Sequence, residues 1–423
     1  MRHILGKHWA HLAALAVLLA AFAAGQRASA AGQTFSLDTP HYQVQTDISP
    51  AFAQLVAKHM EAIFLEYSSL FRNYGQVTSK FRVIVYGHEA DYRQAIPQGY
   101  WGSAGIFISA SQVLVAHAEK RTTEDVLRTL YHEGFHQFMF EAVAQDSPVW
   151  VNEGIAEYFS NATWNGRTFA LGEVPAIQLY VIQQKIKNGS CLPFARLFRL
   201  TSEEWRSASA GDQRQAGLLY TEAWSVVHFL VHAENGRYSS MLDRYLKAVS
   251  QGQGFESALT DVFGKDYGQF EQSWARYVMA LKPSPKFACR DNMECLLLLA
   301  KFVYTDPRAL KSVTQLRQDV LYQNRAGWQI TRPTGEKLSS DQPDQVVALF
   351  RCPLDQGGAE ISYIVIHDGR TGMPTLVCTH HPGVVELAYY ERDGAGGLKV
   401  TVEEQVWETL TPDMQQAILA ASR

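Results

Sequence analysis

The sequence predicts an α+β protein with two folded regions behind a short leader segment. The chain has 423 residues, of which 47% are hydrophobic and 19% are charged, so it has enough apolar material for more than one buried core. Short runs with strand-like alternation precede a long region of helical periodicity. Strand-like runs then return beyond residue 328.

The charge balance argues against a polyanionic partner. Lys and Arg number 38 against 42 Asp and Glu, which gives a net charge of -4. Nucleic-acid-binding proteins usually show a basic excess, and this chain has none. We therefore expect no nucleic-acid partner.

Residues 1–30 have the composition of a secretory signal peptide. They contain three basic residues, no acidic residue, and an apolar run at 12–24 that is too short to span a membrane comfortably. Ala28-Ser29-Ala30 follows as a small-x-small cleavage site. We expect cleavage near Ala30 and a secreted or periplasmic mature chain without a membrane span. An uncleaved N-terminal anchor is the alternative.

The first folded region is expected at residues 31–283. Strands are predicted at 41–46 and 81–86, and a hairpin at 105–109 and 113–117. Ser49 followed by Pro50 is typical of a helix start, and the apolar spacing then continues to Phe71. From residue 123 to about 277 the apolar spacing is mostly helical. The region should therefore combine a mixed sheet with a helical lobe.

Residues 284–325 are predicted as a helical connector and residues 326–423 as a small β-sandwich-like domain. The expected strands are at 346–352, 361–367, 375–379, 385–391 and 398–404, separated by Gly and Asp turns. Thr411-Pro412-Asp413 then opens a short final helix.

All five cysteines follow the predicted cleavage site. Because an oxidising compartment permits disulfides, we predict the pairs Cys289–Cys295 and Cys352–Cys378. Cys191 is left as a free, buried thiol. The chain has no Cys-x-x-Cys pair, so the spacing predicts neither a thiolate zinc site nor a thioredoxin motif.

A candidate metal-binding motif lies in the helical segment 123–144. His132 and His136 are four residues apart, so they project from one helix face about one turn apart. This spacing lets two imidazoles bind one small cation, as in the His-Glu-x-x-His pattern of zinc peptidases. Glu133 is one position further round the helix, where it would contact a water on the metal. Two ordinary histidines on a helix are the alternative.

A second helix, expected at 149–160, offers two carboxylates with the same spacing. Glu153 follows His136 by 17 residues, which is enough chain to turn back past the site. We predict Glu153 as the third ligand, because two histidines and a glutamate form open catalytic zinc sites. Glu157 is predicted to accept a hydrogen bond from the outer ring nitrogen of His132. A solvated helix glutamate is the alternative for Glu157.

These motifs resemble the gluzincin metallopeptidases, the clan of thermolysin and the zinc aminopeptidases. The closer likeness is to the bacterial peptidase-MA-like group, and it extends over about residues 35–280. The matching residues are His132-Glu133-x-x-His136, Asn152-Glu153-Gly154-x-Ala156-x-Tyr158, Tyr220-Thr221-Glu222-Ala223-Trp224, Phe255-x-x-Ala258-Leu259, Phe263-Gly264 and Phe270-Glu271-x-x-Trp274-x-x-Tyr277.

The resemblance implies a gluzincin-like catalytic domain with a mixed-sheet lobe and a helical zinc-binding lobe. It also implies that Tyr220 stabilises the oxyanion, since its segment resembles the one that carries this tyrosine. The zinc aminopeptidases have a Gly-x-Met-Glu-Asn segment before the zinc helix, and none precedes His132 here. This departure favours an endopeptidase.

The predicted function is therefore an exported zinc-dependent endopeptidase acting on a peptide or protein substrate. Zn²⁺ is expected on His132, His136 and Glu153, with Glu133 as the base. The strand at 113–117 is expected to offer an edge for an extended peptide.

Two other classes of function stay open. One is a catalytically inactive gluzincin scaffold that acts as a cell-envelope binding module. The other places the function in the C-terminal domain, as a docking module for a protein or envelope partner. His228 and His232 form another pair four residues apart, but their apolar flanks predict packed helix residues rather than ligands.

Overall fold

The computed structural model describes residues 33–75, 77–143, 147–211, 213–323, 327–369, 371–380, 384–394, 396–407 and 410–422. The predicted signal peptide at 1–30 lies outside these residues. Among the residues described, no helix has both the length and the apolar character that crossing a membrane requires. The fold is α+β, as the sequence predicts.

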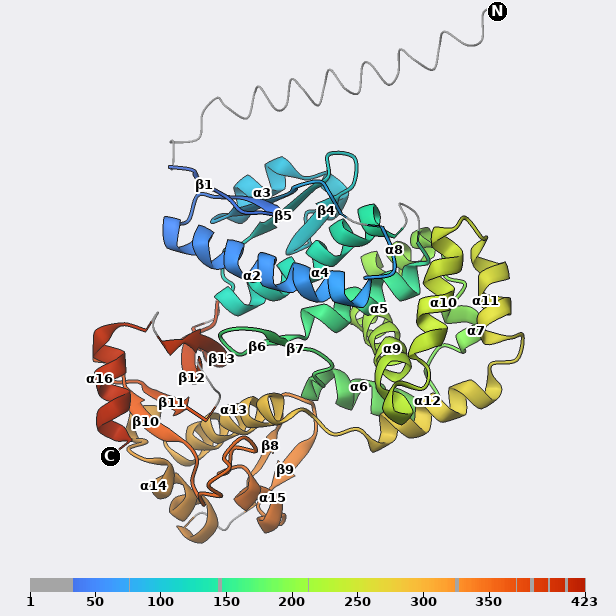
Figure 1. The fold of residues 1–423 in the computed structure, drawn as a ribbon. Helices are drawn as coiled ribbons and strands as arrows, with labels where there is room; N and C mark the ends of the chain where they lie inside the picture. Colours follow the sequence, from blue (N-terminus) through green and yellow to red (C-terminus); the bar gives the residue numbers. More distant parts are fainter. Residues whose placement is uncertain are drawn as a thin grey trace, which may run out of the picture.

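A five-stranded mixed sheet forms the N-terminal part of the molecule (Figure 1). Its strands are β1 (Phe35–Asp38), β2 (Tyr42–Thr46), β3 (Phe81–Tyr86), β4 (Gly105–Ile108) and β5 (Val113–His117), in the order β1-β2-β3-β5-β4. The strand pairs β2–β3 and β3–β5 are parallel, whereas β1–β2 and β4–β5 are antiparallel. The sequence indicated 113–117 as the edge for a peptide, but β5 lies inside the sheet, whose edge strands are β1 and β4.

Strand alternation places helices on both faces of this sheet. Val83 and Leu114 point toward α2 (Pro50–Leu70) and α4 (Thr123–Ala142), within the main core. On the other face, Val113 and Val115 pack with Tyr92 of α3 (Glu89–Ala95). A short 3₁₀ turn, η1 (Gln98–Tyr100), follows α3. Ser49 caps α2 by accepting a hydrogen bond from the Phe52 N–H, as the Ser-Pro signal predicts.

A helical lobe continues the same core. It contains α5 (Val149–Ser160), α6 (Ala176–Lys187), α7 (Phe194–Leu197), α8 (Ser202–Gly211), α9 (Gln213–His232), η2 (Ala233–Gly236), α10 (Ser239–Ser250), α11 (Phe255–Phe263) and α12 (Gly268–Ala280), with a small hairpin of β6 (Thr163–Trp164) and β7 (Phe169–Ala170). The helix α5 packs between α4 and α9. Gly154 permits the close approach to α9, because a Cβ there would lie 2.7 Å from the Ala223 carbonyl oxygen.

The C-terminal region has a second core around one antiparallel sheet. The sheet order is β10 (Ile364–His367), β11 (Pro374–Cys378), β12 (Val384–Arg392) and β13 (Leu398–Val406). The other elements are α13 (Pro285–Val303), η3 (Pro307–Ala309), α14 (Val313–Gln318), the π-helical η4 (Asp319–Gln323), the hairpin β8 (Gln329–Thr331) and β9 (Lys337–Ser339), α15 (Pro343–Ala348) and α16 (Pro412–Ala421). The final helix α16 begins at Pro412, as predicted.

This region differs from the expected β-sandwich because helices, not a second sheet, cover the four-stranded sheet. Leu376 and Ala388 pack on the side of α13, whereas Val377 and Leu387 pack on the side of α16. Helices therefore take the place of a second sheet, and α13 belongs to this core rather than serving only as a connector. The strand expected at 346–352 is also wrong, because α15 occupies its start. A short apolar run fits a buried helix turn as well as a strand.

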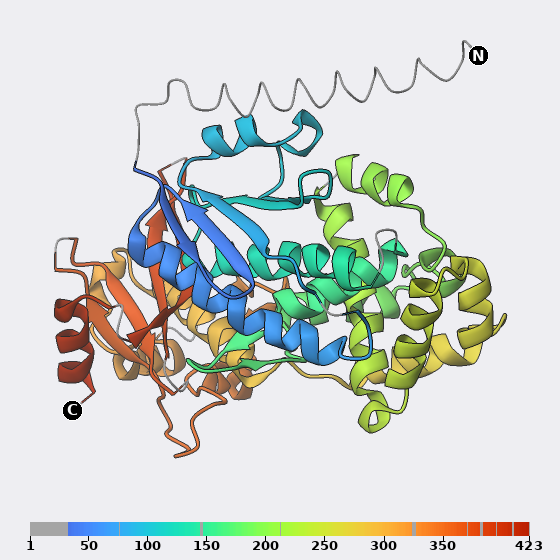
Figure 2. The same cartoon turned by 45° about the horizontal axis from the view of Figure 1, so that its top comes forward.

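The two regions meet at the N-terminal end of α4. Figures 1 and 2 show the C-terminal region on the side of the molecule opposite to α10 and α11. Arg290 of α13 lies 2.5 Å from Glu124 of α4, and Lys286 pairs with Glu404 of β13. Burial alone would raise the pKa of Glu124, but Arg290 and Lys286 lower it to about 2. This ion-pair cluster fixes the C-terminal region to the first turn of α4.

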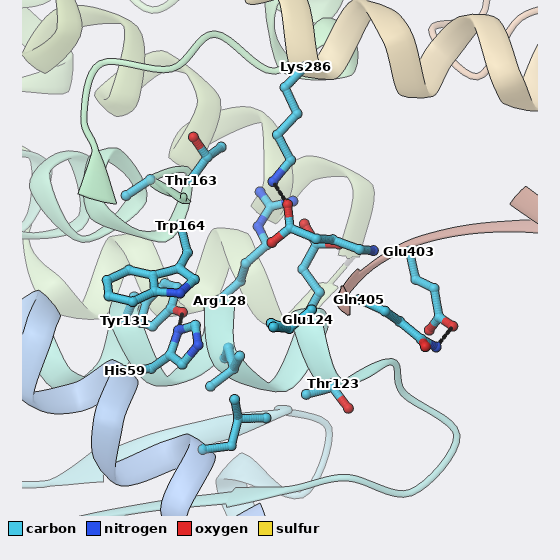
Figure 3. A pocket seen from close by; sticks show the side chains of 15 residues that line it. His59, Thr123, Glu124, Arg128, Tyr131, Thr163, Trp164, Lys286, Glu403 and Gln405 are labelled. Atoms are coloured by element: carbon cyan, nitrogen blue, oxygen red, sulfur yellow. Dashed lines mark hydrogen bonds and ion pairs between the residues drawn. The ribbon is translucent and has the colours of Figure 1, made fainter. Parts of the chain in front are cut away.

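A cavity of about 300 Å³ lies at the same junction. Figure 3 shows that Arg128 and Tyr131 of α4 reach it from one side, and Lys286 and Glu403 from the C-terminal region. The cavity lies along α4 before the His132 motif, so it is separate from the candidate metal centre.

Candidate metal centre

Local sequence fixes where α4 begins and hence which face carries its histidines. Thr122 accepts a hydrogen bond from the Asp125 N–H, and the Asp125 carboxylate accepts one from the Thr122 N–H. This capping box satisfies backbone donors that the first turn would otherwise leave unpaired. From this start, His132 and His136 project one turn apart toward α5.

The side chain of Glu153 meets both histidines from α5. Its Oε2 lies 3.3 Å from Nε2 of His132 and 3.4 Å from Nε2 of His136. This oxygen is buried, yet it makes no hydrogen bond of good geometry. The three donor atoms lie within 4.8 Å of one another and converge on one point. Such an orphaned oxygen between two imidazole nitrogens fits a small cation.

The cluster lies in a partly open position. The side chains of His132, His136 and Glu153 are 14%, 15% and 16% exposed. A structural zinc site is closed by four protein ligands, whereas a catalytic site has three and keeps one position for water or substrate. The three candidate ligands and their partial exposure fit the second type.

A hydrogen-bond acceptor faces the outer nitrogen of each histidine. Nδ1 of His132 lies 3.2 Å from Oε1 of Glu157, where the sequence expects it. Nδ1 of His136 lies 3.1 Å from Oδ1 of Asn152, a contact that the sequence analysis did not assign. With each Nδ1–H donating, the neutral imidazole that binds a metal would direct its Nε2 lone pair toward Glu153.

The Glu157 carboxylate is itself held in place from α6. Gln178 donates to its Oε2 at 2.9 Å and accepts from Asn161 at 2.8 Å. Arg128 donates to the same Asn161 side chain and to the Ser160 carbonyl. No periodic signal in the sequence links Gln178 to this site, because it lies on a different helix with unrelated spacing.

Opposite charges dominate the electrostatics of the cluster. Burial alone would raise the pKa of Glu153, but His136 and His132 lower it to about 2. Burial alone would raise the pKa of Glu157, but the hydrogen bond and charge of His132, together with Arg128 and Gln178, lower it. Both carboxylates are therefore ionised at neutral pH, and Glu153 meets the requirement that a metal ligand be deprotonated.

Glu133 points from α4 toward the edge of the sheet. Its Oε2 accepts a hydrogen bond of 2.9 Å from the Phe107 N–H of β4. Gly105 permits this close contact between strand and helix, since a Cβ there would lie 2.6 Å from Cγ2 of Thr129. The Phe107 contact, which the sequence analysis also missed, holds the carboxylate beside the histidine cluster.

Tyr220 reaches the cluster from α9. Its ring centroid lies 6.0 Å from that of His132, and the Trp205 ring of α8 packs edge-on against it at 5.3 Å. Burial and then the Glu153 charge raise the pKa of the phenol above its ordinary value, and a hydrogen bond with Trp205 offsets part of this. The phenol is therefore protonated at neutral pH and able to donate a hydrogen bond.

Of the second histidine pair, His228 lies in the core, as predicted, whereas His232 at the end of α9 is exposed. His228 is buried, with Nε2 3.0 Å from the Gly172 carbonyl oxygen and Nδ1 2.8 Å from the Tyr277 hydroxyl. Nε2 of His232 lies 3.1 Å from the Tyr158 hydroxyl. Both side chains are engaged in packing contacts of the helical lobe.

Comparison with known proteins matches this part of the chain to a family without an assigned function. Residues 126–253 match the family described as "Protein of unknown function (DUF1570)". The matched segment runs from the first turns of α4 to just beyond α10, and it contains every candidate residue from His132 to Tyr220. The comparisons found no significant match among curated proteins or among solved structures. The chain is thus similar, over its candidate metal centre, to a family of unknown function.

Proposed function

We propose that this protein is an exported zinc-dependent metallopeptidase that cleaves within peptide chains. The observation that supports it most is the buried Glu153 Oε2 between the Nε2 atoms of His132 and His136. Three ligands of this type with an open fourth position are the donor set of hydrolytic zinc sites. Zinc held there would act as a Lewis acid and lower the pKa of a bound water to about 7.

Glu133 is the proposed general base. It neighbours His132 in the chain, and the Phe107 N–H fixes one oxygen of its carboxylate. In this role it takes the proton of the attacking water and later delivers it to the leaving amine. Tyr220 donates from its protonated phenol to the oxyanion that forms at the scissile carbonyl.

The edge strand β4 is the proposed surface for the substrate. It ends the sheet order, and its Phe107 N–H faces Glu133 rather than another strand. An extended peptide that adds to such an edge brings its main chain past the catalytic groups. This arrangement suits a cut within a chain and needs no pocket for a free amino terminus.

The test combines metal analysis with cleavage of a broad peptide library. Purified wild-type protein should cleave peptides and lose this activity with a chelator. Glu133→Gln keeps the shape of the side chain and removes the base, so it should retain zinc and lose turnover. Glu141→Gln, on the same helix but with its carboxylate at the Ser79 N–H, is the matched control and should stay active.

Two results would overturn this proposal. Cleavage by Glu133→Gln at the wild-type rate would place the activity elsewhere. A fully zinc-loaded wild-type protein that cleaves nothing would favour the alternative of an inactive scaffold that binds an envelope partner.

A further inference from the structure

Three cysteines from different parts of the C-terminal region meet in its core. Cys289 lies on α13, Cys352 follows α15, and Cys378 ends β11. Their sulfur atoms all lie within 4.8 Å of one another, and the sulfurs of Cys289 and Cys378 are 3.5 Å apart. The three residues are 0%, 3% and 0% exposed. The cluster is separate from the candidate metal centre, which lies in the other core.

This arrangement contradicts the predicted pair Cys289–Cys295. Both residues lie on α13, six positions apart, which separates them by about 9 Å along the helix axis. Cα atoms more than about 7 Å apart cannot be bridged without moving the backbone. Cys295 is outside the cluster, so the expected loop between the two cysteines is replaced by a straight helix. The predicted pair Cys352–Cys378 is not formed either, since both thiols are free.

The spacing of the three sulfurs suits one metal ion. Zinc binds thiolate sulfur at about 2.3 Å with tetrahedral geometry, which places neighbouring sulfurs about 3.8 Å apart. The separation of 3.5 Å between Cys289 and Cys378 is close to this value, and the third sulfur lies within 4.8 Å of both. A disulfide would join only two of the three sulfurs, whereas one metal ion can bind all three.

Backbone N–H groups face two of the three sulfurs. The Leu354 N–H donates to the sulfur of Cys352, and the His380 N–H donates to the sulfur of Cys378. In both cases the donor is two residues beyond the cysteine. The ligands of metal sites are oriented in this way by the groups around them.

Two polar side chains near the cluster, Tyr363 and His380, have backbone carbonyl partners, so the three sulfurs form the candidate donor set. The Tyr363 hydroxyl lies 3.1 Å from the Arg351 carbonyl oxygen, and it also contacts Cys289. Nε2 of His380 lies 3.1 Å from the Ser362 carbonyl oxygen. The His380 ring is outside the group of donor atoms within 4.8 Å, so the three thiolates alone carry the argument.

We propose that Cys289, Cys352 and Cys378 together bind one zinc ion, which fastens α13 and the segment after α15 to the sheet. The three sulfurs are buried in a different core from the candidate catalytic residues, so the proposed ion would hold the elements of this core together. The cysteine spacing predicted no thiolate zinc site, because the chain has no Cys-x-x-Cys pair. These three ligands instead come from three separate elements, which only the fold brings together.

Zinc content of the purified full chain provides the first test. We expect two zinc ions in wild type and one in His136→Ala, which removes the candidate catalytic site. Cys352→Ser should also retain one, and Cys295→Ser, a matched buried thiol of α13 outside the cluster, should retain two. The two zinc counts depend on different residues. A result that contradicts the thiolate site would therefore leave the proposed catalytic site untouched, and a result that contradicts the catalytic site would leave the thiolate site untouched.

A spectroscopic measurement avoids any dependence on a variant that fails to fold. Cobalt(II) exchanged into His136→Ala should show the intense sulfur-to-cobalt charge-transfer absorption that only thiolate ligands produce. The proposal is overturned by a disulfide among the three cysteines in freshly purified protein, or by a cobalt spectrum without the charge-transfer band.

Discussion

Oε1 of Glu157 lies 3.2 Å from Nδ1 of His132, on the side of the ring opposite to Glu153. The imidazole is therefore held between two carboxylates, one at each nitrogen. The carboxylate at Nδ1 fixes the tautomer and the plane of the ring, and it raises the electron density at Nε2. The two glutamates are four residues apart on α5, so a single helix supplies both.

Glu157→Ala should weaken zinc binding by about 10–100-fold, the usual effect of losing such a partner. The affinity is measured by competition with a chelator. Gln178→Ala removes only the side chain that steadies Glu157, so it should have a smaller effect in the same direction. Equal affinity in wild type and Glu157→Ala would show that this carboxylate does not orient His132.

Asn152→Ala should lower zinc affinity through His136 rather than His132. The Asn152 amide oxygen is the acceptor for Nδ1 of His136 in the structure. Asn152→Asp keeps an acceptor oxygen at that position and should restore most of the affinity lost in Asn152→Ala. If both variants bind zinc like wild type, the contact has no part in metal binding.

Tyr220→Phe should lower kcat by about 10²–10³, the cost of removing one oxyanion donor, and change KM much less. The kinetics are measured on the best substrate from the peptide library. Tyr238→Phe, whose hydroxyl contacts Glu234 away from the site, is the control and should behave like wild type. A loss confined to KM would instead assign Tyr220 to substrate binding.

The unfolding free energy should fall as the pH drops from about 6.5 toward 4, in part because of His228. Burial lowers the pKa of His228 from 6.5 to about 4, so within this window the unfolded chain takes up a proton that the folded chain rejects. The contribution of neutral His228 to the unfolding free energy is therefore present above pH 6.5 and is lost on acidification. The loss is at most about 1.4 kcal/mol per pH unit.

Denaturant unfolding of chelator-treated protein at several pH values measures this dependence. His228→Gln should flatten the curve between pH 6.5 and 4, whereas the exposed His88→Gln should leave its slope unchanged. An unchanged slope in His228→Gln would show that other groups account for the acid sensitivity.

Gly154→Ala should destabilise the protein by about 1–3 kcal/mol, the typical cost of overpacking a core. The new methyl group would meet the Ala223 carbonyl oxygen at 2.7 Å and Cγ2 of Val227 at 2.8 Å. Gly217→Ala on α9 is the control, since nothing lies within 4 Å of its Cβ position, and it should stabilise slightly. Equal thermal midpoints for the two variants would contradict the tight α5–α9 packing.

The sequence indicated the candidate centre best where its residues share a helix or adjacent helices. His132 with His136, and Glu153 with Glu157, follow the period of a helix, so their common faces are readable from spacing alone. Tyr220 is distant in the chain and was assigned only by resemblance.

The missed contacts of Asn152, Gln178 and the Phe107 N–H join different elements and leave no periodic pattern. The cysteine cluster was mispredicted for the same reason. Nearness in sequence favoured pairing Cys289 with Cys295, whereas packing of α13 on the sheet brings Cys289 to Cys378. The β-sandwich expectation failed because strand runs with apolar residues on both faces do not reveal whether a sheet or a helix covers each face.

The ion pairs at the start of α4 have a consequence for dividing the protein into fragments. A fragment that ends at residue 283 would lack Arg290, Lys286 and Glu404, and it would expose the junction face of the helix that also carries His132. Glu124 would lose Arg290 and the Glu404 N–H, although the N-terminal region keeps its own core. The shortest fragment that retains these ion pairs extends through β13, almost to the end of the chain.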